Sequence, residues 1–175
     1  VRLPRVREVV QAALSSDAFA THVLLFDKTP RDNWAVRWHQ DITIAVRERC
    51  DVEGLGPWSM KAGVPHVAAP VAVLNRVVAL RLHLDDCFAQ HGPLQVRLSS
   101  HAHGKVPVDA RPALFNRTTI AECCTPRGGA VLMHPLAFHH STKATAPTHR
   151  RVLHIEFADI TLPAPLQWHE RMPMK

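Results

Sequence analysis

The stretch "HRRVLHIEFADITL", residues 149–162, carries the clearest fold signal in the chain. Leu153, Ile155 and Phe157 take every second position, with Val152, a histidine and a glutamate at the positions between them. Because successive side chains of a strand point to opposite faces, this alternation predicts a half-buried β-strand. One face should pack in a core, and the other should meet solvent or a polar cavity.

Strand patterns of this kind recur along the chain at short intervals. Residues 20–29 and 92–104 read as strands that end in polar turns, and further short strands follow the Gly-Gly pair at 128–129. The apolar spacing of residues 5–14 predicts a helix at the front, and the Gly- and Pro-containing residues 51–70 predict a long loop. Many short strands with few helices predict an all-β sandwich or barrel.

Residues 73–86, "VLNRVVALRLHLDD", end in a second period-two pattern. The leucines at 80, 82 and 84 face one way, whereas Arg81, His83 and Asp85 face the other. A face that carries a cation, an imidazole and a carboxylate lines either solvent or a polar cavity. His83 and Asp85 are interpreted as polar lining or a structural pair rather than as metal ligands.

Bulk composition excludes several classes of protein. The chain has 175 residues, 46% hydrophobic and 21% charged, which fits one globular domain over residues 1–175. No apolar run reaches the ~20 residues of a membrane span, and the amphipathic N-terminus does not resemble a signal peptide. The four cysteines lack zinc-site spacing. We therefore expect reduced thiols in a cytoplasmic protein without a membrane partner.

The net charge of +6 raises the question of an anionic partner. Lys and Arg are scattered rather than clustered, and the chain contains no Tyr, so the basic and aromatic surface of a nucleic-acid-binding protein is missing. We expect no nucleic-acid partner. A small-molecule substrate, with an acidic one favoured by the charge, suits this composition better.

His39-Gln40-Asp41 precedes a β-branched, strand-like run and has the spacing of two iron ligands. A non-haem iron(II) oxygenase binds its metal with two His and one carboxylate on one octahedral face. The same spacing recurs at His83 and Asp85, so the motif alone does not decide. The third ligand must come from a distant strand. The downstream candidates are His134, His139, His140, His149 and His154.

An arginine narrows the choice among these histidines. A 2-oxoglutarate co-substrate chelates iron through its keto-acid end and needs a cation for its far carboxylate, for which the planar arginine is suited. His139 near the end of one strand and Arg150 on the next would lie on one wall, with residues 142–148 as the turn. Ser141, two residues past His139, lies on the same strand face and can donate to that carboxylate.

The ordered set "WHQD … LRLHLDD … GPLQVRLSSH … GGAVLMHPLAFHHS … HRRVLHIEF" resembles the phytanoyl-CoA dioxygenase family of non-haem iron, 2-oxoglutarate-dependent oxygenases. The resemblance covers roughly residues 20–160. It implies a mainly β fold, the double-stranded β-helix or jelly roll of cupin-like proteins, with the N-terminal helix or helices packed outside. It also implies Fe(II) as cofactor, with 2-oxoglutarate and O₂ as co-substrates.

The resemblance also implies a role for individual residues. His39, Asp41 and His139 are the expected metal ligands and catalytic centre, and Arg150 and Ser141 are expected to bind 2-oxoglutarate. Arg81 and Trp58 complete the expected co-substrate site; Trp58 stands in the long loop, where Lys61 also could border the pocket. The retained Asp41 favours hydroxylation over halogenation, because a halogenase leaves that position free for halide.

Two register alternatives and two alternative functions stay open. His140 adjoins His139 where the family has a small residue, and Arg151 adjoins Arg150 but points the other way on a strand. His101 stands in a Ser-His turn that departs from the family pattern. The alternative functions are a cupin-like metalloenzyme that does not use 2-oxoglutarate and a non-catalytic basic β-sandwich binding module. We predict an iron(II)- and 2-oxoglutarate-dependent hydroxylase of a small molecule.

Overall fold

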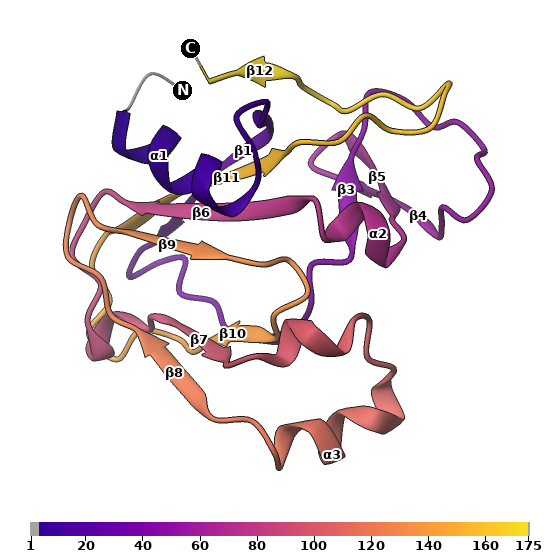
Figure 1. Ribbon diagram of the computed structural model, residues 1–175. Coiled ribbons are helices and arrows are strands. Elements are labelled where there is room, and N and C mark those ends of the chain that lie inside the picture. Colours follow the sequence, from indigo (N-terminus) through magenta and orange to yellow (C-terminus); the bar gives the residue numbers. More distant parts are fainter. Residues whose placement is uncertain (1–3, 175) are drawn as a thin grey trace.

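Two antiparallel sheets face each other in a computed structural model that describes residues 4–174 (Figure 1). The large sheet has the strand order β12-β1-β11-β6-β9, and the small sheet has the order β2-β10-β7-β8. The large sheet consists of β1 (Phe19–Lys28), β6 (Val77–His83), β9 (Ala130–Met133), β11 (Arg150–Ala158) and β12 (Met172–Pro173). The small sheet consists of β2 (Val36–His39), β7 (Leu94–Arg97), β8 (Ile120–Cys123) and β10 (His139–Ser141). This arrangement is the predicted jelly roll.

The pairing of β1, β11 and β6 builds the centre of the large sheet. β11 lies between its two antiparallel neighbours, with Leu153 opposite Leu25 on one side and Leu82 on the other. Its alternation places Ile155 and Phe157 on the outer face, where they pack with Leu80 beneath helix α1 (Pro4–Ala13). The helix predicted at residues 5–14 is therefore confirmed, and it covers the outer face of the large sheet (Figure 1).

A third sheet occupies residues that the Gly and Pro content predicts to be loop. It consists of β3 (Thr43–Ala45), β4 (Trp58–Lys61) and β5 (Val64–Ala68). The prediction of a continuous loop over residues 51–70 was wrong, because β4 and β5 form a hairpin around Ala62 and Gly63. Both turn residues have positive φ, the conformation that a tight two-residue hairpin turn requires.

Short helical turns fill the remaining connections. They are α2 (Val71–Leu74), η1 (Ala89–His91), η2 (Ser100–His103), η3 (Val108–Ala110) and α3 (Arg111–Phe115). α2 contains the first residues of the stretch 73–86: Val73 and Leu74 are buried in a core cluster with Ile44 and Leu136, and β6, which carries the period-two pattern, begins at Val77.

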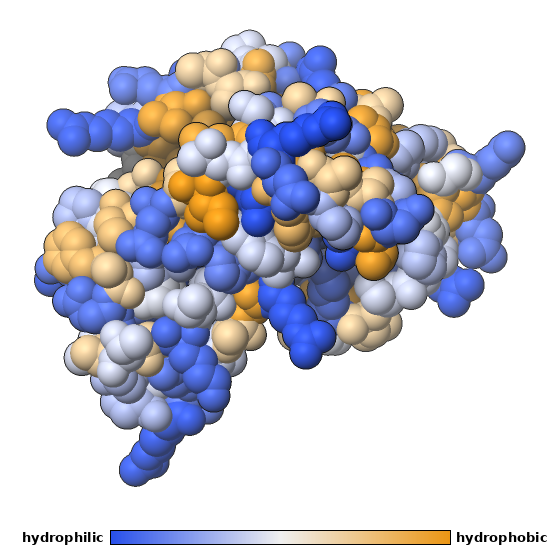
Figure 2. Space-filling view, turned by 90° about the horizontal axis from the view of Figure 1, so that it is seen from below, coloured by the Kyte–Doolittle hydropathy of each residue, from blue (hydrophilic) through white to orange (hydrophobic). Residues whose placement is uncertain are grey.

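The surface mixes polar and apolar side chains. In the view from below, toward α3 and β8, hydrophilic and hydrophobic residues are interspersed (Figure 2). Among the residues that the structure describes, no helix is long and apolar enough to cross a membrane. The four cysteines are unpaired thiols, as the sequence predicts.

Candidate metal centre and cavity

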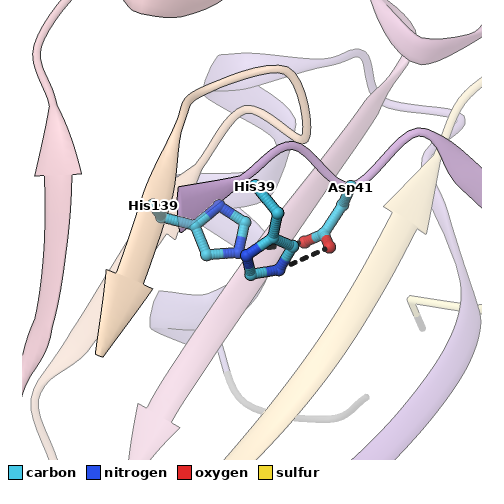
Figure 3. Close-up of side chains that lie close together, drawn as sticks. All are labelled: His39, Asp41 and His139. Atoms are coloured by element: carbon cyan, nitrogen blue, oxygen red, sulfur yellow. Dashed lines mark ion pairs between the residues drawn. The ribbon is translucent and has the colours of Figure 1, made fainter. Parts of the chain in front are cut away.

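The strand pairing of β2 with β10 brings two histidines next to each other. His39, the last residue of β2, is the register partner of His139, the first residue of β10, and their ring centroids lie 4.1 Å apart. Asp41 follows where β2 has ended, and its backbone N–H donates to the Pro135 carbonyl at 2.9 Å. Leaving the strand frees Asp41 from alternation, so its carboxylate turns toward the side on which His39 lies (Figure 3).

Gln40, the middle residue of this motif, fixes the turn. Its side-chain amide donates to the carbonyls of Gly104 and Leu136, each at 2.7 Å, and its Oε1 accepts from the Val106 N–H at 3.0 Å. These bonds tie the turn to two other segments on the side away from the cluster. The positions of His39 and Asp41 are therefore set by a neighbour as well as by the strand.

The ligand atoms of His39, Asp41 and His139 all lie within 4.8 Å of one another. The Nε2 of His39 is 3.4 Å from one Asp41 carboxylate oxygen, and the Nε2 of His139 is 3.5 Å from the other. Figure 3 shows the three side chains converging. This donor set, two imidazoles and one carboxylate, is the facial arrangement that suits Fe(II).

Backbone carbonyls orient both imidazoles for metal binding. The Nδ1 of His39 contacts the Arg37 carbonyl at 2.8 Å, and the Nδ1 of His139 contacts the Ala137 carbonyl at 2.9 Å. A carbonyl can only accept, so Nδ1 carries the hydrogen and Nε2 of the neutral ring keeps its lone pair. This orientation by a second hydrogen bond is common to metal-binding histidines. The residues therefore fit a divalent metal.

The pKa values of the cluster reflect burial and mutual contact. Burial acts to raise the pKa of Asp41, but the neighbouring imidazoles of His39 and His139 outweigh it and hold the pKa well below its usual range. Burial lowers the pKa of His139 to about 4. The carboxylate is ionised and His139 is neutral at pH 7, which are the forms that bind metal.

A cavity of about 430 Å³ opens beside the cluster, within the range of small-molecule sites. Leu24 and Phe26 of β1 and Val36 and Leu94 of the small sheet give it apolar walls. The residues predicted for the site that also line it are His39, Asp41, Arg81, His139, Ser141 and Arg150. Lys61 lines it as well.

Trp58 is the predicted site residue that does not line this cavity. Its ring packs against the core cluster that contains Ile44 and Val67, and the guanidinium of Arg49 lies 5.7 Å from the ring centroid. Trp58 belongs to β4, whose hairpin presents Lys61 and Ala62 to the cavity instead. The sequence alone does not show that Trp58 packs in the core while Lys61, three residues later, lines the cavity.

Neighbouring residues in the two pairs that the sequence leaves open, His139 with His140 and Arg150 with Arg151, have different surroundings in the structure. His139 joins the cluster, whereas His140 packs on Trp38, with ring centroids 4.0 Å apart, and its Nε2 contacts Gln95 Oε1 at 2.7 Å. Arg150 is buried, whereas Arg151 is exposed and makes a bidentate ion pair with Asp85 at 2.6 and 2.8 Å.

Of the other histidine candidates, His154 lines the cavity but lies outside the three-residue cluster, and the rest lie elsewhere. His134 accepts from the Leu136 N–H at 3.1 Å, with His101 beside its ring at 5.2 Å, and His149 pairs with Asp27 at 2.8 Å. His83 is buried and does not pair with Asp85, which Arg151 engages instead. The second His-x-Asp spacing therefore makes no metal site.

Three buried or half-buried cations gather beside the cluster. The Nη1 of Arg150 donates to the Gly92 carbonyl at 2.7 Å, while its Nε has no partner. A Cβ on Gly92, whose φ is +63°, would lie 2.6 Å from the Thr142 carbonyl oxygen, so only glycine fits this contact. Arg81 donates to His154 Nδ1 at 3.2 Å, and burial lowers the pKa of Arg81 to about 10.

Lys28 is the third cation, and sequence reasoning missed it. Its side chain is fully buried, and its Nζ donates to Ser141 Oγ at 3.3 Å and to the Thr142 carbonyl at 2.5 Å. Burial, followed by the charge of Arg150, lowers its pKa to about 8. Within the described residues, Lys28, Arg81 and Arg150 have no carboxylate partner. Buried cations that lack a carboxylate partner form an environment suited to an anion.

The jelly roll and its two-histidine, one-carboxylate cluster define the architecture of a non-haem oxygenase. The family model "Phytanoyl-CoA dioxygenase (PhyH)" matches residues 1–152, and the chain belongs to this family. A search of curated proteins gives no significant match.

Solved structures confirm the fold. The non-haem α-ketoglutarate-dependent epimerase SnoN from nogalamycin biosynthesis is 13% identical, with a TM-score of 0.64 over 98% of this chain and 64% of its own. EctD from S. alaskensis, solved with 2-oxoglutarate and 5-hydroxyectoine, is 16% identical, with a TM-score of 0.63 over 88% and 49%. The non-haem monooxygenase ThoJ is 17% identical, with a TM-score of 0.63 over 95% and 55%. The chain thus spans about half to two thirds of these proteins.

Proposed function

We propose that this chain is an Fe(II)- and 2-oxoglutarate-dependent dioxygenase domain that hydroxylates a small molecule. The observation that carries the proposal is the convergence of His39, Asp41 and His139 beside buried cations that lack a carboxylate partner. One half of this arrangement suits Fe(II), and the other half suits the dianionic co-substrate. Membership of the family supports both halves.

The three ligands would hold iron through His39 Nε2, His139 Nε2 and the Asp41 carboxylate. When bound, iron supplies the activation of O₂ that is coupled to the oxidation of 2-oxoglutarate. The carbonyls of Arg37 and Ala137 keep both rings oriented before the metal arrives. Because three protein ligands leave positions open on an octahedral ion, co-substrate and O₂ can reach it. The carboxylate at residue 41 favours hydroxylation over halogenation, since it would occupy the position that a halogenase leaves free for halide.

Arg150, Ser141 and Lys28 would bind the far carboxylate of 2-oxoglutarate. Arg150 retains an unpartnered Nε, Ser141 lines the cavity, and the Lys28 ammonium lies against the Ser141 hydroxyl. A carboxylate placed there would offset part of the positive charge of Lys28 and Arg150, and of Arg81 on the same wall. The apolar side chains of Leu24, Phe26 and Leu94 would keep water away. The co-substrate would then be oriented by iron at its keto-acid end and by Arg150 at its far carboxylate.

The test is metal content together with succinate formation. Wild-type protein should bind one equivalent of Fe(II) under anaerobic conditions and convert 2-oxoglutarate to succinate in air. Arg150→Ala should keep the iron and lose succinate formation, whereas Arg151→Ala, a change at the exposed ion pair, should keep both. Bound metal without 2-oxoglutarate turnover in the wild type would indicate a cupin-like metalloenzyme that does not use this co-substrate. Absence of any stoichiometric metal would refute both enzyme functions.

A further inference from the structure

The two central strands give the cavity two chemically different ends. β1 and β11 run antiparallel, with Lys28 opposite Arg150 and His22 opposite Glu156. Both pairs belong to the inward-facing positions, and Lys28 stands six positions after His22, which corresponds to about 20 Å along a strand. The end formed by Arg150 and Ser141 is rich in donors, with the buried Lys28 next to Ser141, and Leu24 and Phe26 lie between the two ends. The His22 and Glu156 end contains a carboxylate.

Glu156 presents a carboxylate with free hydrogen-bonding capacity. Its nearest polar neighbours are His154 Nε2 at 3.7 Å and His22 Nδ1 at 4.0 Å, both beyond hydrogen-bond distance. Arg81 can only donate to His154 Nδ1, so His154 carries its hydrogen on Nε2, directed toward Glu156 but not bonded to it. Within the described residues, no donor reaches this carboxylate, and its side chain remains 18% exposed in the cavity.

Neutral imidazoles surround this carboxylate. His66 Nδ1 contacts the Val64 carbonyl at 2.9 Å, so it carries the hydrogen and Nε2 is left as an acceptor. Burial lowers the pKa values of His66 and His22, which keeps both rings uncharged at pH 7. His22 is 7% exposed, and its buried Nδ1 has no hydrogen-bond partner. The rings of His66 and His169 lie edge-on to it at 5.5 and 5.7 Å.

One cation balances the charge at this end. Lys61 lines the cavity, and its charge acts on His66 together with that of Glu156. Its Nζ donates to Thr43 Oγ1 at 2.7 Å, so it stands at the exposed rim. Glu156 and Lys61 therefore contribute opposite charges to the lining of this end. An anionic ligand would be repelled by the carboxylate, and a cationic ligand would meet Lys61 and Arg81, whereas a neutral group with donors and acceptors meets a partner for each.

We propose that the Glu156 end of the cavity binds the primary substrate, and that this substrate is an uncharged, hydroxyl-rich molecule of the polyol or sugar type. The substrate hydroxyls donate to the Glu156 carboxylate and to His66 Nε2, and accept from Lys61. This inference rests on the proposed function, since the opposite end is assigned to 2-oxoglutarate. It also revises the expectation of an acidic substrate, because the buried cations that would attract one belong to the co-substrate end.

Ligand-detected NMR tests the inference. The protein is loaded with Zn(II) and 2-oxoglutarate, and saturation transfer is measured to myo-inositol and trehalose as neutral polyols, to 1,6-diaminohexane and to adipate. A polyol should be the tightest of these probes. Glu156→Gln should weaken it by about tenfold or more, because a hydrogen bond to a charged group is lost. Glu156→Asp, which keeps the charge with a shorter reach, should weaken it less.

Glu48→Gln is the matched control, because Glu48 is exposed in the loop after β3 and undergoes the same chemical change. Thermal unfolding verifies that each variant is folded. Tighter binding of diaminohexane or adipate, no polyol binding, or equal polyol affinity in wild type and Glu156→Gln would overturn the inference. Repeating the polyol titration without 2-oxoglutarate separates the two hypotheses. If 2-oxoglutarate does not bind but the polyol still binds in a Glu156-dependent way, only the proposed co-substrate is wrong. If 2-oxoglutarate binds but Glu156→Gln leaves polyol affinity unchanged, only the proposed substrate class is wrong.

Discussion

The buried ammonium of Lys28 makes the stability of the protein depend on pH in a way that one substitution can isolate. Burial lowers the pKa of Lys28 from its ordinary 10.5 to about 8. Between these two values the unfolded chain holds the proton and the folded protein has released it, so stability rises with pH across this window. Below pH 8 both states are charged, and the full cost of burying the charge is present.

The magnitude follows from the difference between the two pKa values. A shift of about 2.5 pKa units corresponds to about 3 kcal/mol at pH 7, of which about 2.5 kcal/mol disappears by pH 10. Lys28→Met removes the charge and keeps the length of the side chain. Relative to this variant, metal-free wild-type protein should therefore gain about 2.5 kcal/mol of unfolding free energy between pH 7 and pH 10.

Urea unfolding of both proteins at four or five pH values measures this difference. Lys143→Met is the control, because Lys143 is exposed in the loop that follows β10. Its substitution should give a stability difference that does not change with pH. A wild-type minus Lys28→Met difference that is flat from pH 7 to pH 10 would refute the reasoning, since it would mean that Lys28 is either solvated or already paired with an anion.

Three further substitutions test other parts of the structure. His139→Ala should abolish stoichiometric Fe(II) binding while His140→Ala retains it, as measured by metal analysis after anaerobic loading; equal loss in both would contradict the three-residue cluster. Phe157→Ala should lower the unfolding free energy by about 3–5 kcal/mol, because this side chain is fully buried beneath α1; a loss below about 1 kcal/mol in urea unfolding would speak against that packing. Gly92→Ala should raise the dissociation constant of 2-oxoglutarate in a calorimetric titration, because its Cβ would push away the segment that contacts Arg150; unchanged affinity would count against this contact.

The fold was largely predictable because its central strands alternate. β11 is flanked by strands on both sides, with one face in the apolar core and the other on a polar cavity, so its period-two pattern survives in the sequence, and the pattern of residues 80–83 in β6 does so for the same reason. The β4-β5 hairpin was not predictable in this way. Its strands are four and five residues long, and its turn depends on Ala62 in a conformation that alanine rarely adopts.

Some residues of the candidate site could be predicted from the sequence and others could not. His39, Asp41 and His139 could be proposed because the first two stand two positions apart in a His-x-Asp motif and the third lies in a motif with an arginine eleven positions further on. Lys28 could not, because a lysine before a Thr-Pro turn reads as a surface residue. Its burial depends on the pairing of β1 with β11, which places it opposite Arg150. The alternation in the sequence places His154 and Glu156 on one face of a strand, and only the 3.7 Å separation shows that the carboxylate keeps free hydrogen-bonding capacity.

The most direct test of the central claim is an anaerobic titration of Fe(II)-loaded protein with 2-oxoglutarate, followed by visible absorption. Chelation of the iron by the co-substrate should produce a weak charge-transfer band that saturates at one equivalent. The band should require His39, Asp41 and His139, and Arg150→Ala should shift its midpoint to higher concentration while Arg151→Ala leaves it unchanged. Stoichiometric iron with no band at any 2-oxoglutarate concentration would contradict the proposed co-substrate.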